Sequence, residues 1–147
     1  MSQGKSGGIP RGSTAMSSEQ PAAGLSPRQG AALEHLIRVE RERTAGRVAG
    51  LTRELGVIVE SSAIGATDDE HDPEGSTIAF ERAQISALLT AARNQLADLE
   101  RAAERLRAGS YGICTSCGDR IVLDRLMARP TAQTCMSCAA ARRYRHS

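Results

Sequence analysis

The sequence predicts an all-α fold, in which an antiparallel coiled-coil hairpin is followed by a small four-cysteine module and a C-terminal helix. Three observations lead to this prediction. Only 2% of the 147 residues are aromatic, fewer than a packed globular core normally uses, and Ala, Leu, Arg and Glu are common, as in long helices. Two long segments repeat apolar residues at helical spacing. The four cysteines occur as two closely spaced pairs.

Composition divides the chain into three expected segments. Residues 1–25 are rich in Gly, Ser, Pro and Gln and are expected to form a disordered tail, in which Met16 is a second candidate start. Residues 26–109 are expected to form the hairpin, with an acidic tip near 62–75. Residues 110–147 are expected to form the four-cysteine module with a basic C-terminal helix.

The first long helix is expected to begin after Ser26. Ser26 is a good N-cap, Pro27 suits the first helical position, and Gln29 completes a capping box. The helix is expected to run to about Glu60–Ser62. Its apolar stripe, with Thr44 between two groups, is Leu33, Ile37, Val48, Leu51, Leu55 and Ile58. Three internal glycines each cost about 1 kcal/mol relative to alanine, so this helix needs a partner.

The second long helix supplies that partner. Asp72 is the expected N-cap, Pro73 the first helical residue, and Gly109 the C′ residue that ends the helix. The apolar seam has heptad spacing from Ile85 onward. Its residues are Ile78, Ile85, Leu89, Ala92, Leu96, Leu99, Ala103 and Leu106. Arms of about 32 residues give a rod of roughly 45–50 Å. A hairpin that pairs with itself needs no second chain, so a monomer is expected.

The cysteines predict a metal site. Cys114 and Cys117 form one Cys-x-x-Cys pair, and after seventeen residues Cys135 and Cys138 form the other. This is the spacing of a tetrahedral zinc site, with disulfides or free thiols as the alternative. Four thiolates leave no position for water or substrate, so the zinc is expected to be structural. Gly118 follows the first pair, where a positive φ is useful.

Several function classes are disfavoured. The formal net charge is only +2, which gives no general argument for nucleic-acid binding. No apolar run is long enough for a membrane span, and no signal peptide is evident. Zinc-ligating cysteines suit a reducing cytoplasm. The sequence contains no nucleophile with a matching base and no nucleotide fingerprint, so we do not expect an enzyme.

The second half of the chain carries three motifs of one family. They are Asp72-Pro73, the run Gly109-Ser-Tyr-Gly-Ile-Cys-Thr-Ser-Cys-Gly118, and the run Arg125-Leu-Met-Ala-Arg-Pro-Thr-Ala-Gln-Thr-Cys135. On these motifs, which cover about half of the chain, the sequence resembles the DksA/TraR family of bacterial transcription regulators. The resemblance implies a coiled-coil rod with a zinc module at its base.

The resemblance also implies a function. Members of this family bind RNA polymerase, insert the coiled-coil tip through the secondary channel, and alter the stability of promoter complexes. Carboxylates at the tip act near the active site, and the corresponding candidates here are Asp68, Asp69, Asp72 and Glu74. Some members act with the alarmone (p)ppGpp, which becomes a candidate ligand at the interface.

The tip departs from the motif Asp-x-x-Asp-x-Ala of the better-known members. When Asp72 takes the first position, Gly75 takes the second and Thr77 the alanine position. When Asp69 and Asp72 are the pair, Glu74 takes the alanine position. Channel binding is therefore better supported by the resemblance than a particular regulatory effect. The alternative to a functional role at the tip is a structural one for Asp72, which would serve only as the N-cap of the second helix. The other tip carboxylates would then be solvated loop charges without a target.

Four arginines are candidate polymerase contacts: Arg125, Arg129, Arg142 and Arg143. The alternative for the first two is compensation of thiolate charge, and for the last two a solvated helix end that complements the helix dipole.

An alternative function for the chain is a sequence-specific DNA-binding finger with GATA-like cysteine spacing. The span 119–134 has a net charge of only +1 and no aromatic residue, so direct DNA binding is not expected. A third hypothesis for the function is a scaffold whose hairpin docks other helices.

Overall fold

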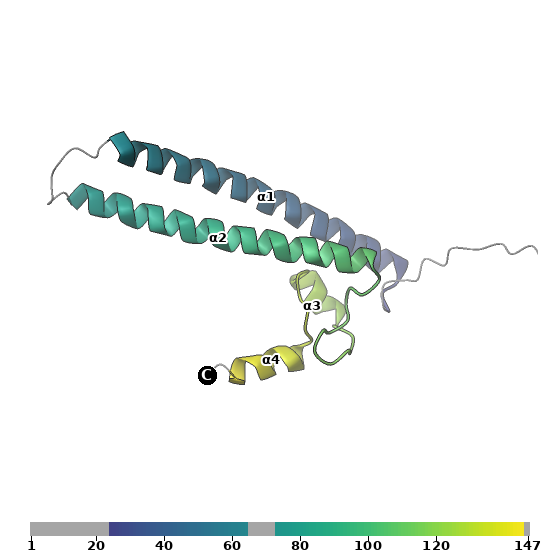
Figure 1. The fold of residues 1–147 in the computed structure, drawn as a ribbon. Helices are drawn as coiled ribbons and strands as arrows, with labels where there is room; N and C mark the ends of the chain where they lie inside the picture. Colours follow the sequence, from purple (N-terminus) through teal and green to yellow (C-terminus); the bar gives the residue numbers. More distant parts are fainter. Residues whose placement is uncertain (1–23, 65–72, 146–147) are drawn as a thin grey trace, which may run out of the picture.

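The computed structural model describes residues 24–64 and 73–145, and this part of the chain contains four α-helices and no β-strand. The helices are α1 (Pro27–Ile64), α2 (Pro73–Arg107), α3 (Leu123–Ala128) and α4 (Met136–Arg145). Figure 1 shows α1 and α2 side by side as a long hairpin, with α3 and α4 beside one end of it. The predicted all-α fold is confirmed. The predicted tail up to residue 23 and most of the acidic tip lie outside the described residues.

The start of α1 follows the predicted capping box. The backbone N–H of Gln29 donates to Ser26 Oγ at 3.2 Å, and the backbone N–H of Ser26 donates to Gln29 Oε1 at 2.9 Å. This reciprocal pair satisfies two amide groups that a helix start otherwise leaves without partners. The helix then continues for 38 residues to Ile64, slightly beyond the predicted end.

The end of α2 confirms the role of Gly109. This glycine has a φ of +74°, which few side-chain-bearing residues adopt. Its N–H donates to the carbonyl of Leu106 at 3.2 Å, and the N–H of Ser110 donates to that of Arg105 at 2.9 Å. These two bonds make a Schellman motif. The arms have 38 and 35 residues, so the rod is roughly 50–57 Å long, longer than predicted.

The predicted stripes face each other, but burial is uneven along the rod. The fully buried seam positions lie toward the base and the middle: Leu33, Ile37, Thr44, Leu89, Ala92 and Leu99. Seam positions nearer the tip, such as Leu55, Ile58 and Ile78, are only half-buried. Two helices alone bury little surface, because the side chains at their contact are exposed to solvent on both sides of the pair. The base is better packed because a third segment of the chain covers the helices there.

That third segment is the part of the chain after α2. One core cluster joins the hairpin to it and consists of Leu33, Ile37, Ala102, Tyr111, Cys114, Ile121, Leu126 and Ala132. The short helix α3 contributes Leu126 and contacts α1. Residues 110–145, called the zinc module below, are therefore packed against the hairpin rather than tethered to it. No helix of the described ranges is both long enough and apolar enough to cross a membrane.

Candidate metal centre

The four cysteines converge on one point. Cys114 and Cys117 lie in the loop after α2, Cys135 directly precedes α4, and Cys138 lies in its first turn. Their four Sγ atoms all lie within 4.8 Å of one another. The Sγ atoms of Cys117 and Cys135 are 3.8 Å apart, the edge length of a tetrahedron with Zn–S bonds of about 2.3 Å. The four predicted ligands therefore come together, and the donors fit a structural Zn²⁺.

Local backbone bonds hold the two cysteine pairs together. The N–H of Gly118 donates to the carbonyl of Cys114 at 2.9 Å, and the φ of Gly118 is +79°, as predicted. The N–H of Cys114 donates to the carbonyl of Asp119 at 2.8 Å. Between the pairs, the N–H of Thr115 donates to the carbonyl of Gln133 at 2.9 Å. The backbone therefore holds the sulfurs in place for a metal ion.

The thiols are crowded enough to affect one another's ionisation. Backbone hydrogen bonding from Cys135, and then from other amides, lowers the pKa of the Cys114 thiol to about 6. The Asp119 backbone lowers the pKa of Cys117, but neighbouring thiols and burial outweigh it and raise that pKa to about 12. The Cys135 thiol is the main cause of a raised pKa at Cys138. Four thiolates this close require a cation to offset their charge, which bound Zn²⁺ supplies.

Arg105 and Tyr111 join this site to the hairpin. The Arg105 guanidinium donates to the carbonyls of Ile113 at 2.6 Å and Ser110 at 3.2 Å. The buried Tyr111 donates its hydroxyl proton to the carbonyl of Pro130 at 2.9 Å. Sequence reasoning assigned neither role. The signal available was indirect: an aromatic residue in a chain with few of them is a candidate for a core position, and Tyr111 lies beside the cysteines whereas Tyr144 lies near the C-terminus.

Tyr111 gives a prediction about alkaline pH. Burial raises the pKa of Tyr111 from 10.0 to about 12, although the nearby Arg105 charge opposes this. The neutral phenol is therefore favoured by folding. Its contribution to stability is complete below pH 10 and is lost as the pH rises through about 12. The variant Tyr144→Phe removes the second tyrosine, which is 85% exposed. In this variant the tyrosinate absorbance should rise in a single step near pH 12, from Tyr111. A midpoint near pH 10 would contradict the buried position.

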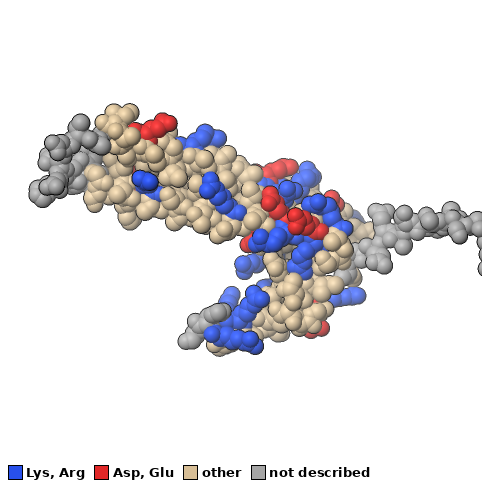
Figure 2. Space-filling model, in the orientation of Figure 1, with Lys and Arg blue, Asp and Glu red and all other residues tan. Residues whose placement is uncertain are grey.

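The four candidate arginines lie around one groove, which we call the α4 groove. It encloses about 730 Å³ between α2, α3 and α4, and its lining includes Arg125, Arg129, Arg142 and Arg143, together with Asp98 and Tyr144. Figure 2 shows basic side chains along α4, whereas the part of the hairpin toward the tip is mostly uncharged on this face. The groove exists because the zinc module lies against the side of the hairpin.

The arginines differ in their surroundings. Arg125 is half-buried and donates from Nε to the carbonyl of Thr134 at 2.9 Å and from Nη1 to Met136 Sδ at 3.0 Å. It therefore fixes α3 to the segment that carries Cys135, a structural role that neither sequence interpretation included. Arg129, Arg142 and Arg143 are exposed. Asp68, Asp69 and Asp72 lie outside the described residues, as does the side chain of Glu74, which falls in the first turn of α2.

Comparison with known proteins finds a family match for the zinc module. A family model for the prokaryotic dksA/traR C4-type zinc finger matches residues 109–144. The uncharacterized protein YteA of Bacillus subtilis is 38% identical over 66 residues, which are 45% of this chain and 28% of YteA. An uncharacterized protein of Aquifex aeolicus is 41% identical over 44 residues, 30% of each chain. The chain thus spans less than a third of the length of these relatives.

A solved structure extends the similarity to the hairpin. The transcription factor DksA2 from Pseudomonas aeruginosa matches with a TM-score of 0.70 and 27% sequence identity. The match covers 86% of this chain and 93% of that one. It therefore includes most of the long helices as well as the module at their base.

Proposed function

We propose that this chain, whose residues 109–144 match the family model of the prokaryotic dksA/traR C4-type zinc finger, is a transcription regulator that binds RNA polymerase. In this proposal the hairpin enters the secondary channel and its acidic tip alters the stability of promoter complexes. The single observation that carries the proposal is the match to the transcription factor DksA2 over 86% of the chain. The chain acts by binding, and we assign it no reaction.

The shape of the hairpin supports this function. Arms of 38 and 35 residues give a rod of roughly 50–57 Å, which reaches from a protein surface toward a buried active site. A compact domain of the same mass would be too wide and too short. Tip carboxylates such as Asp69 and Asp72 would then approach bound Mg²⁺ and basic residues, where a change of charge has a large effect.

The zinc module supports polymerase binding better than DNA binding. A DNA-reading finger needs an exposed helix for the major groove. Here α3 has only six residues, buries Leu126 and contacts α1. Arg125 is engaged with Thr134 and Met136. In the proposed complex the module rests at the channel entrance, with Arg129, Arg142 and Arg143 as candidate contacts.

The proposal has three further parts. The protein acts as a monomer, it is located in the cytoplasm, and (p)ppGpp is a candidate ligand at the interface with polymerase.

Photo-crosslinking tests where the tip goes. A crosslinking amino acid at Gly75 should be tolerated, because this residue is exposed and an added Cβ meets no atom within 4 Å. With RNA polymerase core we expect Gly75 to crosslink to segments near the catalytic Mg²⁺. The same group at Val122, which is exposed on the zinc module, should label only the outer surface. Crosslinks from Gly75 to duplex DNA or to the outer polymerase surface would contradict the proposal.

A further inference from the structure

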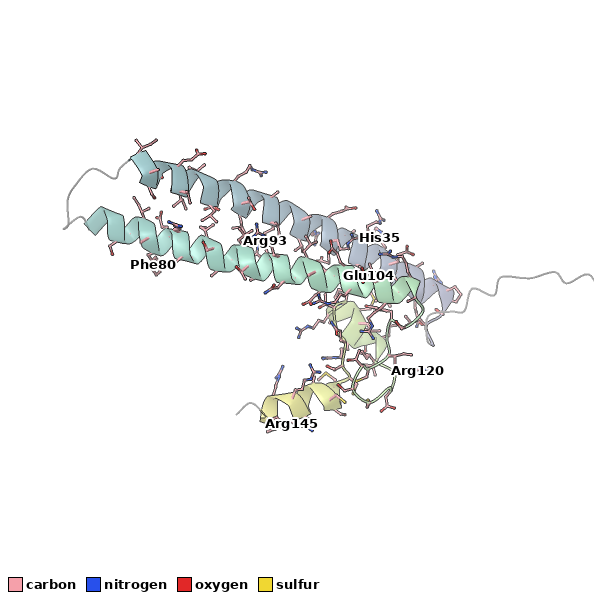
Figure 3. All side chains as sticks on the ribbon, in the orientation of Figure 1. His35, Phe80, Arg93, Glu104, Arg120 and Arg145 are labelled. Carbon is pink, nitrogen blue, oxygen red and sulfur yellow. The ribbon has the colours of Figure 1, made fainter. Side chains whose placement is uncertain are left out.

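A second groove lies between α1 and α2 near the base of the hairpin. It encloses about 310 Å³, and its floor is formed by the apolar residues Ile37, Ala103 and Leu106. Arg38, Arg41 and Arg107 line it, together with Glu34. None of its lining residues comes from the zinc module, so it is distinct from the α4 groove. His35 and Glu104, labelled in Figure 3, mark this end of the hairpin.

Arg41, which lines this groove, has an unmet hydrogen bond. Among the residues that the structure describes, its Nε is the one buried side-chain nitrogen or oxygen without a partner. Neighbouring arginines are engaged: Arg38 with His35 and Glu42, and Arg43 with Glu40. A buried donor without an acceptor is unfavourable, because it has lost its hydrogen bonds to water and gained none in return. An acceptor brought into the groove would supply the missing hydrogen bond.

The charges around the groove indicate what this acceptor is. Glu34 is the acidic residue of the lining, and Glu42, beside the groove, pairs with Arg38 at 4.0 Å, so these two carboxylates offset two of the three arginine charges. One positive charge is left, which suits a monoanion better than a phosphate dianion. A planar guanidinium matches the two oxygens of a carboxylate. The apolar floor suits a hydrocarbon stem behind that carboxylate.

We propose that this groove, which we call the carboxylate groove, binds an acidic side chain of a protein partner through Arg41 and Arg107. The carboxylate accepts from Arg41 Nε, and the methylene stem of the acidic residue lies on Ile37 and Leu106. The identification of RNA polymerase as this partner rests on the proposed function. The contact would hold the base of the hairpin while the tip lies deeper in the channel.

The carboxylate site itself is tested without polymerase. Sodium hexanoate is titrated into the zinc-loaded full chain, and the Nε–H signals of the arginines are followed by NMR, with Arg41→Lys to assign Arg41. We expect a saturable shift at Arg41 and none at Arg47, which is exposed on the same helix. Neutral hexanamide should produce no shift. No saturation at Arg41, or an equal response to hexanamide or at Arg47, would overturn the site.

The source of the carboxylate is tested with polymerase core. The double variant R41Q/R107Q should bind at least tenfold more weakly than wild type. The control R47Q/R53Q, which removes two exposed arginines of α1, should stay within twofold, and both should unfold at the wild-type urea midpoint. Equal binding by both variants would overturn the protein partner as the source. If wild type does not bind, the proposed function fails, whereas the NMR result still decides the site.

Discussion

Replacing Cys135 with serine is expected to abolish zinc binding and to unfold the zinc module. Zinc in small modules contributes about 10–16 kcal/mol of binding free energy, which is also folding free energy. Without it, the module has only a few buried residues, among them Tyr111, Ile121 and Leu126, too few to support an independent fold. We expect near-UV circular dichroism from Tyr111 to collapse and zinc content to fall from one ion per chain to none. Polymerase binding should be lost with them.

The matched control is Ser137→Ala, because Ser137 is exposed on α4 between two ligands and is not one itself. It should retain zinc and wild-type stability. The hairpin should persist in the Cys135 variant with reduced stability at its base, since Leu33 and Ile37 lose neighbours in the shared core. A Cys135→Ser protein with full zinc content and a native Tyr111 signal would show that the metal is not required for the fold.

Leu126→Ala is expected to destabilise the zinc-loaded protein by about 2–5 kcal/mol, the cost of a large-to-small change in a core. Leu126 is 0% exposed and lies in the cluster that joins the hairpin to the module. The cavity would therefore open between these two parts. In urea unfolding with zinc in excess, the midpoint should fall strongly, and the base of the hairpin should lose amide protection first.

Met127→Ala is the matched control for Leu126→Ala. Met127 is the next residue of α3 but is 45% exposed, so its truncation should change the unfolding free energy by about 0.5 kcal/mol or less. A similar loss in both variants would mean that the cost comes from α3 helix formation and not from packing against the hairpin.

Features set by local sequence were predictable. The capping box at Ser26 and Gln29, the positive φ of Gly109 and Gly118, and the helix start at Pro73 all follow from short-range chemistry. The zinc ligands were also predictable, because the spacing within each pair and the number of cysteines leave few arrangements.

Features set by tertiary packing were not predictable. Ala102 lies next to the predicted seam residue Ala103 but is the more buried, because it faces the zinc module. Helix α3 is too short for its apolar spacing to be read. The α4 groove is lined by arginines as far apart in sequence as Arg125 and Arg143, and only the path of the chain around the four cysteines brings them together.

The most direct test measures binding to purified RNA polymerase core and the lifetime of promoter complexes in parallel, for wild type and an Asp69→Ala, Asp72→Ala double variant, with and without (p)ppGpp. The proposal predicts that both proteins bind and that only wild type changes the lifetime, because the fold delivers the tip and its carboxylates act there. If neither protein binds polymerase, the proposed function is wrong and the similarity to DksA2 is one of architecture alone.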